Sequence, residues 1–141
     1  MNVFLDANIL VTVLNREYPK YAGCARVLSL AGNSRYILFT SPLCLGIAWY
    51  FAEKKSGAVM ARKKITVLLD HLHITTLNHQ MALKAMQNKK VKDFEDGLEY
   101  YSALDSRCKC IITDDTHDFY FSDVDVLSPE DFLEKYVIRE R

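Results

Sequence analysis

The sequence predicts an α/β fold with a central, mainly parallel sheet. Short apolar runs alternate along the chain with longer stretches of helical periodicity, and half of the 141 residues are hydrophobic. Strands separated by helices are joined by right-handed crossovers, and this connection produces a parallel sheet. The hydrophobic share and the 26% of charged residues exclude a disordered chain. Because no low-complexity linker divides the sequence, we expect one domain over residues 1–141.

Five short apolar runs are expected to form the strands. The first run, Val3-Phe4-Leu5, is typical of a buried strand, and an acid follows it directly. The later runs are also rich in apolar and β-branched residues and stand next to turn-forming residues. The expected strands are residues 2–6, 36–40, 73–77, 110–113 and 125–127.

Longer segments with apolar residues three and four apart are expected to form helices. In residues 19–30, a proline stands near the first turn, and Tyr21, Cys24 and Leu28 follow at helical spacing. Ser41-Pro42 and Ser128-Pro129 each offer an N-cap followed by proline at the first helical position. The expected helices are residues 9–14, 19–30, 42–53, 58–72, 78–90, 94–107 and a last one from 129.

The charges are distributed unevenly, although the 18 basic and 18 acidic residues cancel. Residues 53–92 carry nine basic and two acidic side chains, whereas residues 93–141 carry five basic and fourteen acidic ones. A basic segment of this kind can hold a nucleic acid backbone, and the alternative is a solvated helix face. The candidate nucleic-acid-binding residues are Lys54, Lys55, Arg62, Lys63 and Lys64, with a further cluster at Lys89, Lys90 and Lys92.

The cysteines and the N-terminus indicate the compartment. The four cysteines form no C-x-x-C pair, so we interpret them as reduced core residues of an intracellular protein. The N-terminus lacks the basic region of a secretory signal, and Asp6 interrupts its apolar run. The longest apolar stretch, residues 42–52, is about half of the ~20 residues that span a bilayer. We therefore expect a cytoplasmic protein without a membrane partner.

Acidic residues follow two of the expected strands. Asp6 follows the first strand, and Asp115 and Asp118 follow the strand at 110–113. Ligands of open parallel sheets bind at the carboxyl ends of the strands, so these acids are expected to converge there. The helix from residue 94 adds Asp96. Asp93, Glu95 and Asp114 are interpreted instead as helix-capping or turn-forming residues.

The composition of this acidic group indicates a hard divalent ion. Crowded carboxylates raise one another's pKa unless a cation neutralises them. Oxygen ligands without a histidine at ligand spacing favour Mg²⁺ or Mn²⁺ over zinc. An ion held in this way polarises a phosphoryl oxygen and activates water, which suits hydrolysis of a phosphodiester.

Four segments resemble those of PIN-domain proteins, and they span essentially the whole chain. They are residues 4–8 (FLDAN), Ser41-Pro42, residues 93–103 (DFEDGLEYYSA) and residues 111–119 (IITDDTHDF), followed by the closing residues 126–133. Each motif is short, but their order and spacing together are specific.

The resemblance implies a three-layer α/β/α sandwich and a Mg²⁺- or Mn²⁺-dependent endoribonuclease, as in VapC-like toxins of toxin–antitoxin pairs. It implies an RNA substrate, an antitoxin protein as partner and a homodimer. It also implies that four acids hold the metal and carry catalysis, and that three polar residues support them. The acids are Asp6, Asp96, Asp115 and Asp118, and the supporting residues are Asn8, Ser41 and Thr113.

One position departs from the family pattern. The acid that the resemblance implies on the second long helix falls near Ile47, which cannot ligate a metal. Glu53 lies six residues further on and points to a different face of the helix, so it is a poor substitute. This departure leaves open a weakly active or inactive PIN-fold module that binds RNA or protein. A third hypothesis is a phosphatase of the haloacid dehalogenase kind, with Asp6 as nucleophile, although Asn8 cannot act as its acid.

Overall fold

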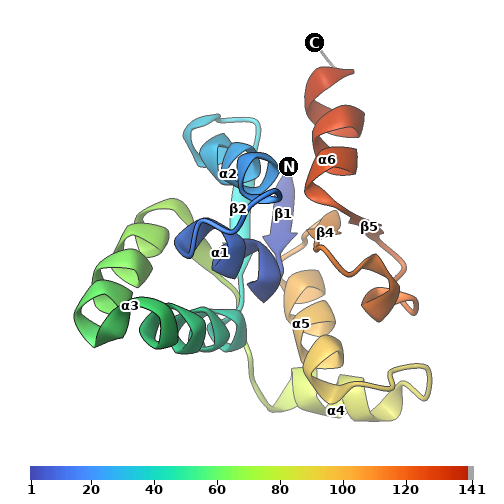
Figure 1. The fold of residues 1–141 in the computed structure, drawn as a ribbon. Coiled ribbons are helices and arrows are strands. Elements are labelled where there is room, and N and C mark those ends of the chain that lie inside the picture. The colour runs from blue at the N-terminus through green and yellow to red at the C-terminus, as the bar shows by residue number, and fades with distance from the viewer. Residues whose placement is uncertain (140–141) are drawn as a thin grey trace.

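The computed structural model describes residues 1–139 and contains a five-stranded sheet at its centre. All neighbouring strands pair in parallel, in the spatial order β3-β2-β1-β4-β5. Strands β1, β2, β4 and β5 are labelled in Figure 1. The strands are β1 (Asn2–Leu5), β2 (Ile37–Thr40), β3 (His73–Ile74), β4 (Cys110–Ile112) and β5 (Asp125–Leu127). The predicted α/β fold with a parallel sheet is therefore confirmed.

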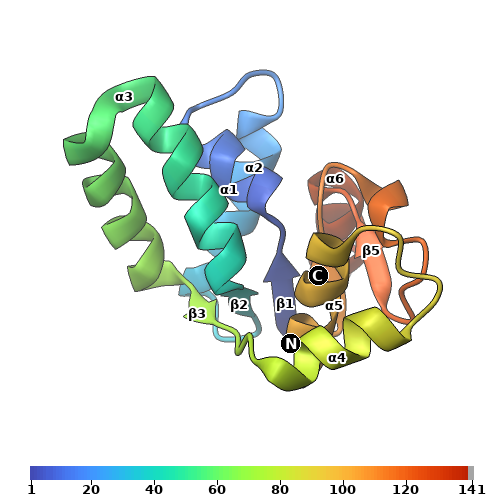
Figure 2. The same ribbon diagram turned by 90° about the horizontal axis from the view of Figure 1, so that it is seen from below.

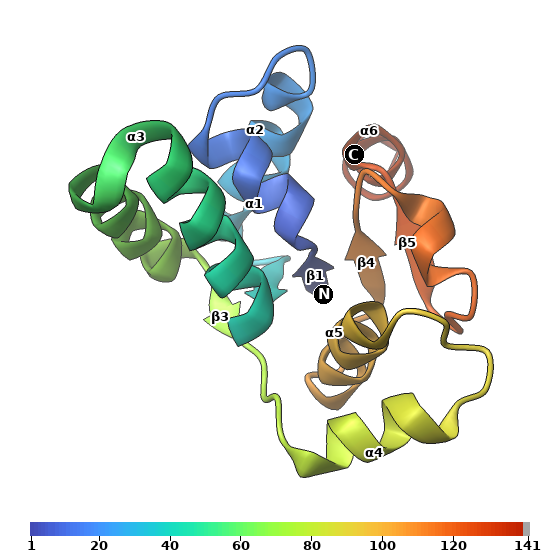
Figure 3. The same ribbon diagram turned by 60° about the horizontal axis from the view of Figure 1, so that its bottom comes forward.

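The helices form two groups on opposite sides of the sheet (Figure 3). On one side α1 packs against α2 and α3, and α2 also packs against α6; on the other side α4 packs against α5. This arrangement is the predicted three-layer sandwich. The helices are α1 (Ala7–Leu14), α2 (Tyr21–Ser29), α3 (Pro42–His71), α4 (His79–Gln87), α5 (Phe94–Asp105) and α6 (Pro129–Phe132), which continues as a π-helical segment, Leu133–Ile138.

The core lies between the central strands and the helices on both sides. Phe4 on β1 and Ile111 on β4 are partners in the ladder and are fully buried, as is Phe132 of α6. The strands are short and aligned, so each one ends at the same edge of the sheet. The backbone N–H of Asp6 donates to Ile112 O, and that of Thr113 donates to Leu127 O. These hydrogen bonds hold the ends of β1, β4 and β5 side by side at one edge of the sheet.

Helix α3 consists of two helical arms, in agreement with the two helices that the sequence predicts at 42–53 and 58–72. The arms span Pro42–His71 and meet at a sharp bend at Gly57, whose φ of 85° lies in the left-handed region. Glycine adopts that conformation readily because it has no Cβ. Figure 2 shows the result, two helical arms that meet at a bend.

Two elements end three residues earlier than predicted. The strand predicted at 73–77 ends at Ile74, and Thr75 instead donates its backbone N–H to Thr40 O and pairs its hydroxyl with Ser102. The helix predicted at 78–90 ends at Gln87. Across residues 1–139, no helix is both long and apolar enough to cross a membrane.

Candidate metal centre

Asp6 lies at the end of β1 and is held in place by hydrogen bonds to both carboxylate oxygens. Its Oδ1 accepts from the backbone N–H of Ala7 at 2.7 Å, so Asp6 caps the N-terminus of α1. Its Oδ2 accepts from the hydroxyl of Thr113 at 2.8 Å. The side chain is buried, with 8% of its surface exposed. The carboxylate is therefore fixed in position at the carboxyl edge of the sheet, as predicted from its place after a strand.

Asn8 and Thr113 form a polar network around this carboxylate. The Thr113 hydroxyl donates to Asp6 and accepts from Asn8 Nδ2 at 3.0 Å and from the backbone N–H of Asp115 at 3.1 Å. Asn8 Oδ1 accepts from the backbone N–H of Asp114 at 3.2 Å. Residues 113–115 are thus held against the first turn of α1 by hydrogen bonds. Ser41, the third predicted support, is buried at the N-terminus of α3 and accepts from the backbone N–H of Cys44 at 3.0 Å.

A pocket of about 600 Å³ opens at this edge of the sheet, and six of its fifteen lining residues are acidic. Lys20 is the one basic residue that lines it within the described chain. The apolar part of the wall includes Ile47 and Phe51 of α3. The acidic lining residues are Asp6, Glu17, Glu95, Asp96, Asp114 and Asp118.

The electrostatics of the pocket favour a cation. Partial burial, with the neighbouring Asp93 and Asp118, raises the pKa of Asp96 to about 7. The pKa of Asp118 is also raised, by loss of solvation and by Asp115. Lys20 Nζ forms a long ion pair with Asp114, at 3.8 Å, and 62% of the Lys20 side chain is exposed. One exposed lysine leaves most of this negative charge unbalanced, and a hard divalent ion is the ligand that an all-oxygen acidic site fits.

The predicted acids do not all meet in the pocket. Asp6, Asp96 and Asp118 line it, whereas Asp115 is exposed and lies outside the lining. Its neighbour Asp114, interpreted from the sequence as a turn former, lines the pocket instead. Asp115 remains close to the site, since it contributes to the raised pKa of Asp118.

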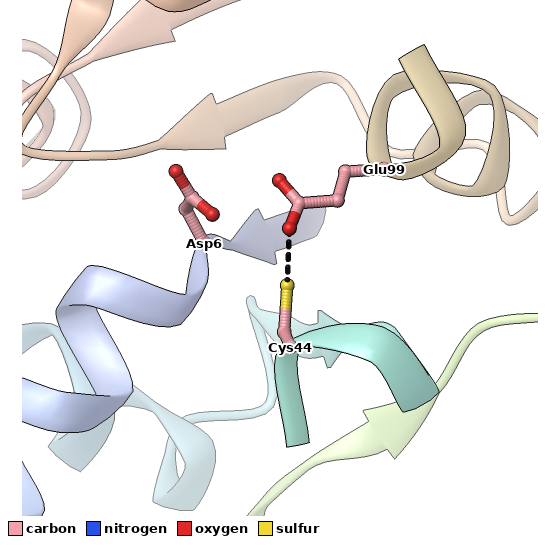
Figure 4. A group of neighbouring side chains, drawn as sticks. All are labelled: Asp6, Cys44 and Glu99. Atoms are coloured by element: carbon pink, nitrogen blue, oxygen red, sulfur yellow. Dashed lines mark hydrogen bonds between the residues drawn. The ribbon is translucent and has the colours of Figure 1, made fainter. Parts of the chain in front are cut away.

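Two buried residues of this centre, Glu99 and Cys44, were not among the predicted site residues. Figure 4 shows Asp6, Cys44 and Glu99 pointing toward one another from the end of β1, from α3 and from α5. Cys44 Sγ donates to Glu99 Oε1 at 3.0 Å. Burial, followed by the nearby Asp6 carboxylate, raises the pKa of Glu99 to about 10. The available sequence signal was its position three residues after Asp96, which places both acids on one face of α5.

Ile47, the position where the resemblance led us to expect an acid, lies at the pocket itself. Ile47 lines the wall, so an acid there would face the other carboxylates. Glu53 is exposed and accepts a hydrogen bond from Trp49 Nε1 at 2.9 Å, outside the pocket lining. The structure thus agrees with the view that Glu53 is a poor substitute.

The predicted basic residues lie along α3, away from the acidic pocket. Lys54 and Lys55 precede the bend at Gly57 and are exposed; Lys55 donates to Asn15 O. Arg62 and Lys63 follow the bend and are also exposed, and Lys64 is half-buried. None of these five residues lines the acidic pocket.

These features are those of a PIN-domain protein, and comparison with known families agrees. The PIN domain family model matches residues 2–117, so the chain belongs to the PIN domain family. The resemblance predicted from the short motifs is confirmed, and the haloacid dehalogenase hypothesis has no support.

Individual relatives refine this assignment. The chain is 26% identical to Ribonuclease VapC1 of Aquifex aeolicus (strain VF5) over 137 residues, 95% of this chain and 94% of that protein. Its fold is similar to that of VapBC-1 from nontypeable Haemophilus influenzae, with a TM-score of 0.71, 19% identity and coverage of 92% and 99% of the two chains. It is also similar to VapBC2 from Rickettsia felis bound to a DNA fragment from their promoter, with a TM-score of 0.68, 18% identity and coverage of 91% and 98%.

Proposed function

We propose that this protein is a Mg²⁺- or Mn²⁺-dependent endoribonuclease and the toxin of a toxin–antitoxin pair. The observation that carries the proposal is the pocket at the carboxyl edge of the sheet, where Asp6, Asp96 and Asp118 converge beside a single lysine of the described chain. The similarity to Ribonuclease VapC1 over nearly the whole chain supports RNA as the substrate.

The side chains of the pocket have distinct roles in this proposal. Asp6, Asp96 and Asp118 hold the ion, and Asp115 adds negative charge beside Asp118. When bound, the ion supplies Lewis-acid polarisation of the phosphodiester and lowers the pKa of water. Thr113 and Asn8 hold the Asp6 carboxylate and the 113–115 turn in position. No side chain is required as a covalent nucleophile.

RNA contacts outside the pocket are assigned to cationic side chains. Lys20 lines the pocket and extends into solvent, with 62% of its side chain exposed, so it can contact a substrate phosphate. The basic residues Lys54, Lys55, Arg62, Lys63 and Lys64 on α3 are assigned to more distant phosphates of the RNA.

A protein partner is the second part of the proposal. The VapBC structures from Haemophilus influenzae and Rickettsia felis support an antitoxin that binds this chain. An antitoxin would inhibit the nuclease by covering the acidic pocket with a basic side chain. Copurification of this chain with the protein encoded next to its gene, and loss of RNA cleavage in that complex, would test this part.

RNA cleavage by the purified protein with Mn²⁺ or Mg²⁺ tests the enzymatic part. Asp6→Asn is expected to lower cleavage on the order of 100-fold or more, because an uncharged amide removes a central ligand of the ion. Asp105→Asn, an exposed acid at the end of α5 outside the pocket lining, is the charge-matched control. Equal cleavage by Asp6→Asn and wild type would refute the proposal, as would cleavage that EDTA leaves unchanged.

Ile47 favours one alternative, a PIN-fold module that binds RNA or protein without cutting RNA. Its apolar side chain lines the pocket at a position where an acid could bind the ion together with Asp6, Asp96 and Asp118. Calorimetric titration showing no divalent-ion binding, together with RNA binding in EDTA, would support this alternative over the nuclease.

A further inference from the structure

Glu99 is a buried acid with an oxygen that makes no hydrogen bond. Only 1% of its surface is exposed. Oε1 accepts from the Cys44 thiol at 3.0 Å, whereas Oε2 has no hydrogen-bond partner among the described residues. A buried polar atom without a partner costs about 1–3 kcal/mol, and more when the group is charged. An oxygen in this position needs either a proton of its own or a cation.

Asp6, Cys44 and Glu99 bring ligand atoms from three elements close together. One atom each of Asp6, Cys44 and Glu99 can be chosen so that all three lie within 4.8 Å of one another (Figure 4). Oxygens on opposite sides of one Mg²⁺ or Ca²⁺ ion lie roughly 4–5 Å apart, because each binds at about 2.0–2.6 Å. The three groups are therefore spaced as ligands around a single ion would be.

No basic side chain of residues 1–139 pairs with Glu99. The ion pairs of the described chain join Lys20 to Asp114, Lys135 to Asp125 and Arg139 to Glu134. Glu99 itself lies outside the pocket lining, but Asp6 belongs to that lining and is its neighbour. A small cation that binds Asp6 from the pocket would therefore lie close to Glu99 as well.

We propose that Glu99 is a ligand of the divalent ion, which it binds together with Asp6, and that Cys44 positions it by donating to Oε1. The role of that ion in RNA cleavage rests on the proposed function, but its binding by Glu99 does not. The competing explanation is a purely structural acid that keeps its own proton. In that case Glu99 would make no contribution to metal affinity.

Mn²⁺ titration of the metal-free protein separates these explanations. We expect Glu99→Gln to lower Mn²⁺ affinity by at least about tenfold, the lower end of the loss seen when groups that support metal ligands are removed. Calorimetry gives the affinity, and electron paramagnetic resonance of free Mn²⁺ gives an independent measure. Asp105→Asn, on the same helix and outside the pocket, is expected to bind as the wild type does. Circular dichroism of each variant verifies that it is folded.

The outcomes distinguish this inference from the proposed function. Wild-type affinity in Glu99→Gln overturns the inference, and RNA cleavage by that variant then leaves the nuclease proposal in place. Weakened Mn²⁺ binding in Glu99→Gln, with no RNA cleavage by the wild type, supports Glu99 as a ligand and refutes the nuclease. A wild-type protein that binds no Mn²⁺ overturns both.

Discussion

Glu99→Gln is expected to stabilise the metal-free protein, by an amount that depends on pH. Burial raises the pKa of Glu99 from its ordinary value of 4.5 to about 10, so the folded state keeps this carboxyl protonated. Below pH 4.5 both the folded and unfolded states carry the proton, and no stability is lost. Above it the unfolded state ionises, and the free energy of unfolding falls by about 1.4 kcal/mol for each pH unit until the folded pKa is reached.

Two and a half pH units separate 4.5 from neutrality, so the wild type loses on the order of 3 kcal/mol at pH 7. Glutamine matches the shape of the protonated acid: its carbonyl can accept from Cys44, and its amide can donate toward Asp6. The variant avoids the loss because its side chain does not ionise.

Thermal unfolding in EDTA between pH 4.5 and 8 measures this difference. For a chain of this size we expect the variant to melt roughly 10 °C above the wild type at pH 7, and at nearly the same temperature at pH 4.5. Asp105→Asn serves as the control, since an exposed acid is not expected to produce this pH dependence. A difference in melting temperature that stays constant across this pH range would refute the reasoning, as would a less stable variant at pH 7.

Four further predictions concern the pocket and the basic residues of α3. Mn²⁺ affinity should rise as pH increases through about 7, where Asp96 loses its proton, and Asp93→Asn should move that rise to lower pH; calorimetry at several pH values measures it. Ile47→Glu should tighten Mn²⁺ binding, because it adds a carboxylate to the pocket wall; an unchanged dissociation constant would contradict this. Thr113→Val should lower the free energy of unfolding by about 1–3 kcal/mol and weaken Mn²⁺ binding. The substitution removes the hydroxyl that donates to Asp6 and accepts from Asn8 and from the Asp115 N–H. Urea unfolding measures the change in stability, and Mn²⁺ titration measures the change in affinity. Replacing Lys63 and Lys64 by glutamate should weaken RNA binding and flatten its salt dependence without changing Mn²⁺ affinity, which filter binding at several salt concentrations would test.

The strands and helices could be predicted because their signals are local. Val3-Phe4-Leu5 is short and apolar, and the caps Ser41 and Ser128 do accept hydrogen bonds from the backbone N–H groups of Cys44 and Asp131. The predicted break between residues 53 and 58 is also local, because Gly57 bends the chain there. The strand at 73–77 is shorter than predicted, and Thr75, just beyond its end, pairs its hydroxyl with the distant Ser102.

The candidate site was partly predictable for a similar reason. Placing Asp6 and Asp118 near one another requires only parallel strands that end at one edge. Whether Asp114 or Asp115 faces the pocket depends on the turn after β4, where the Asp115 N–H is bound to Thr113. The burial of Glu99 depends on how α5 packs against the end of β1 and the first turn of α3, and no local pattern indicates that packing.

The acidic pocket and the buried Glu99 are consequences of one arrangement. The first turns of α1 and α3 and the inner face of α5 meet where β1 ends, so acids from separate segments are forced together. Such a group destabilises the metal-free fold, as the raised pKa values of Asp96 and Glu99 indicate. A divalent ion that binds the folded state alone reverses this effect, and at 100 times its dissociation constant it adds about 2.7 kcal/mol to stability. The burial of these carboxyl groups and their proximity to one another weaken the metal-free protein, and an ion that binds them relieves both effects.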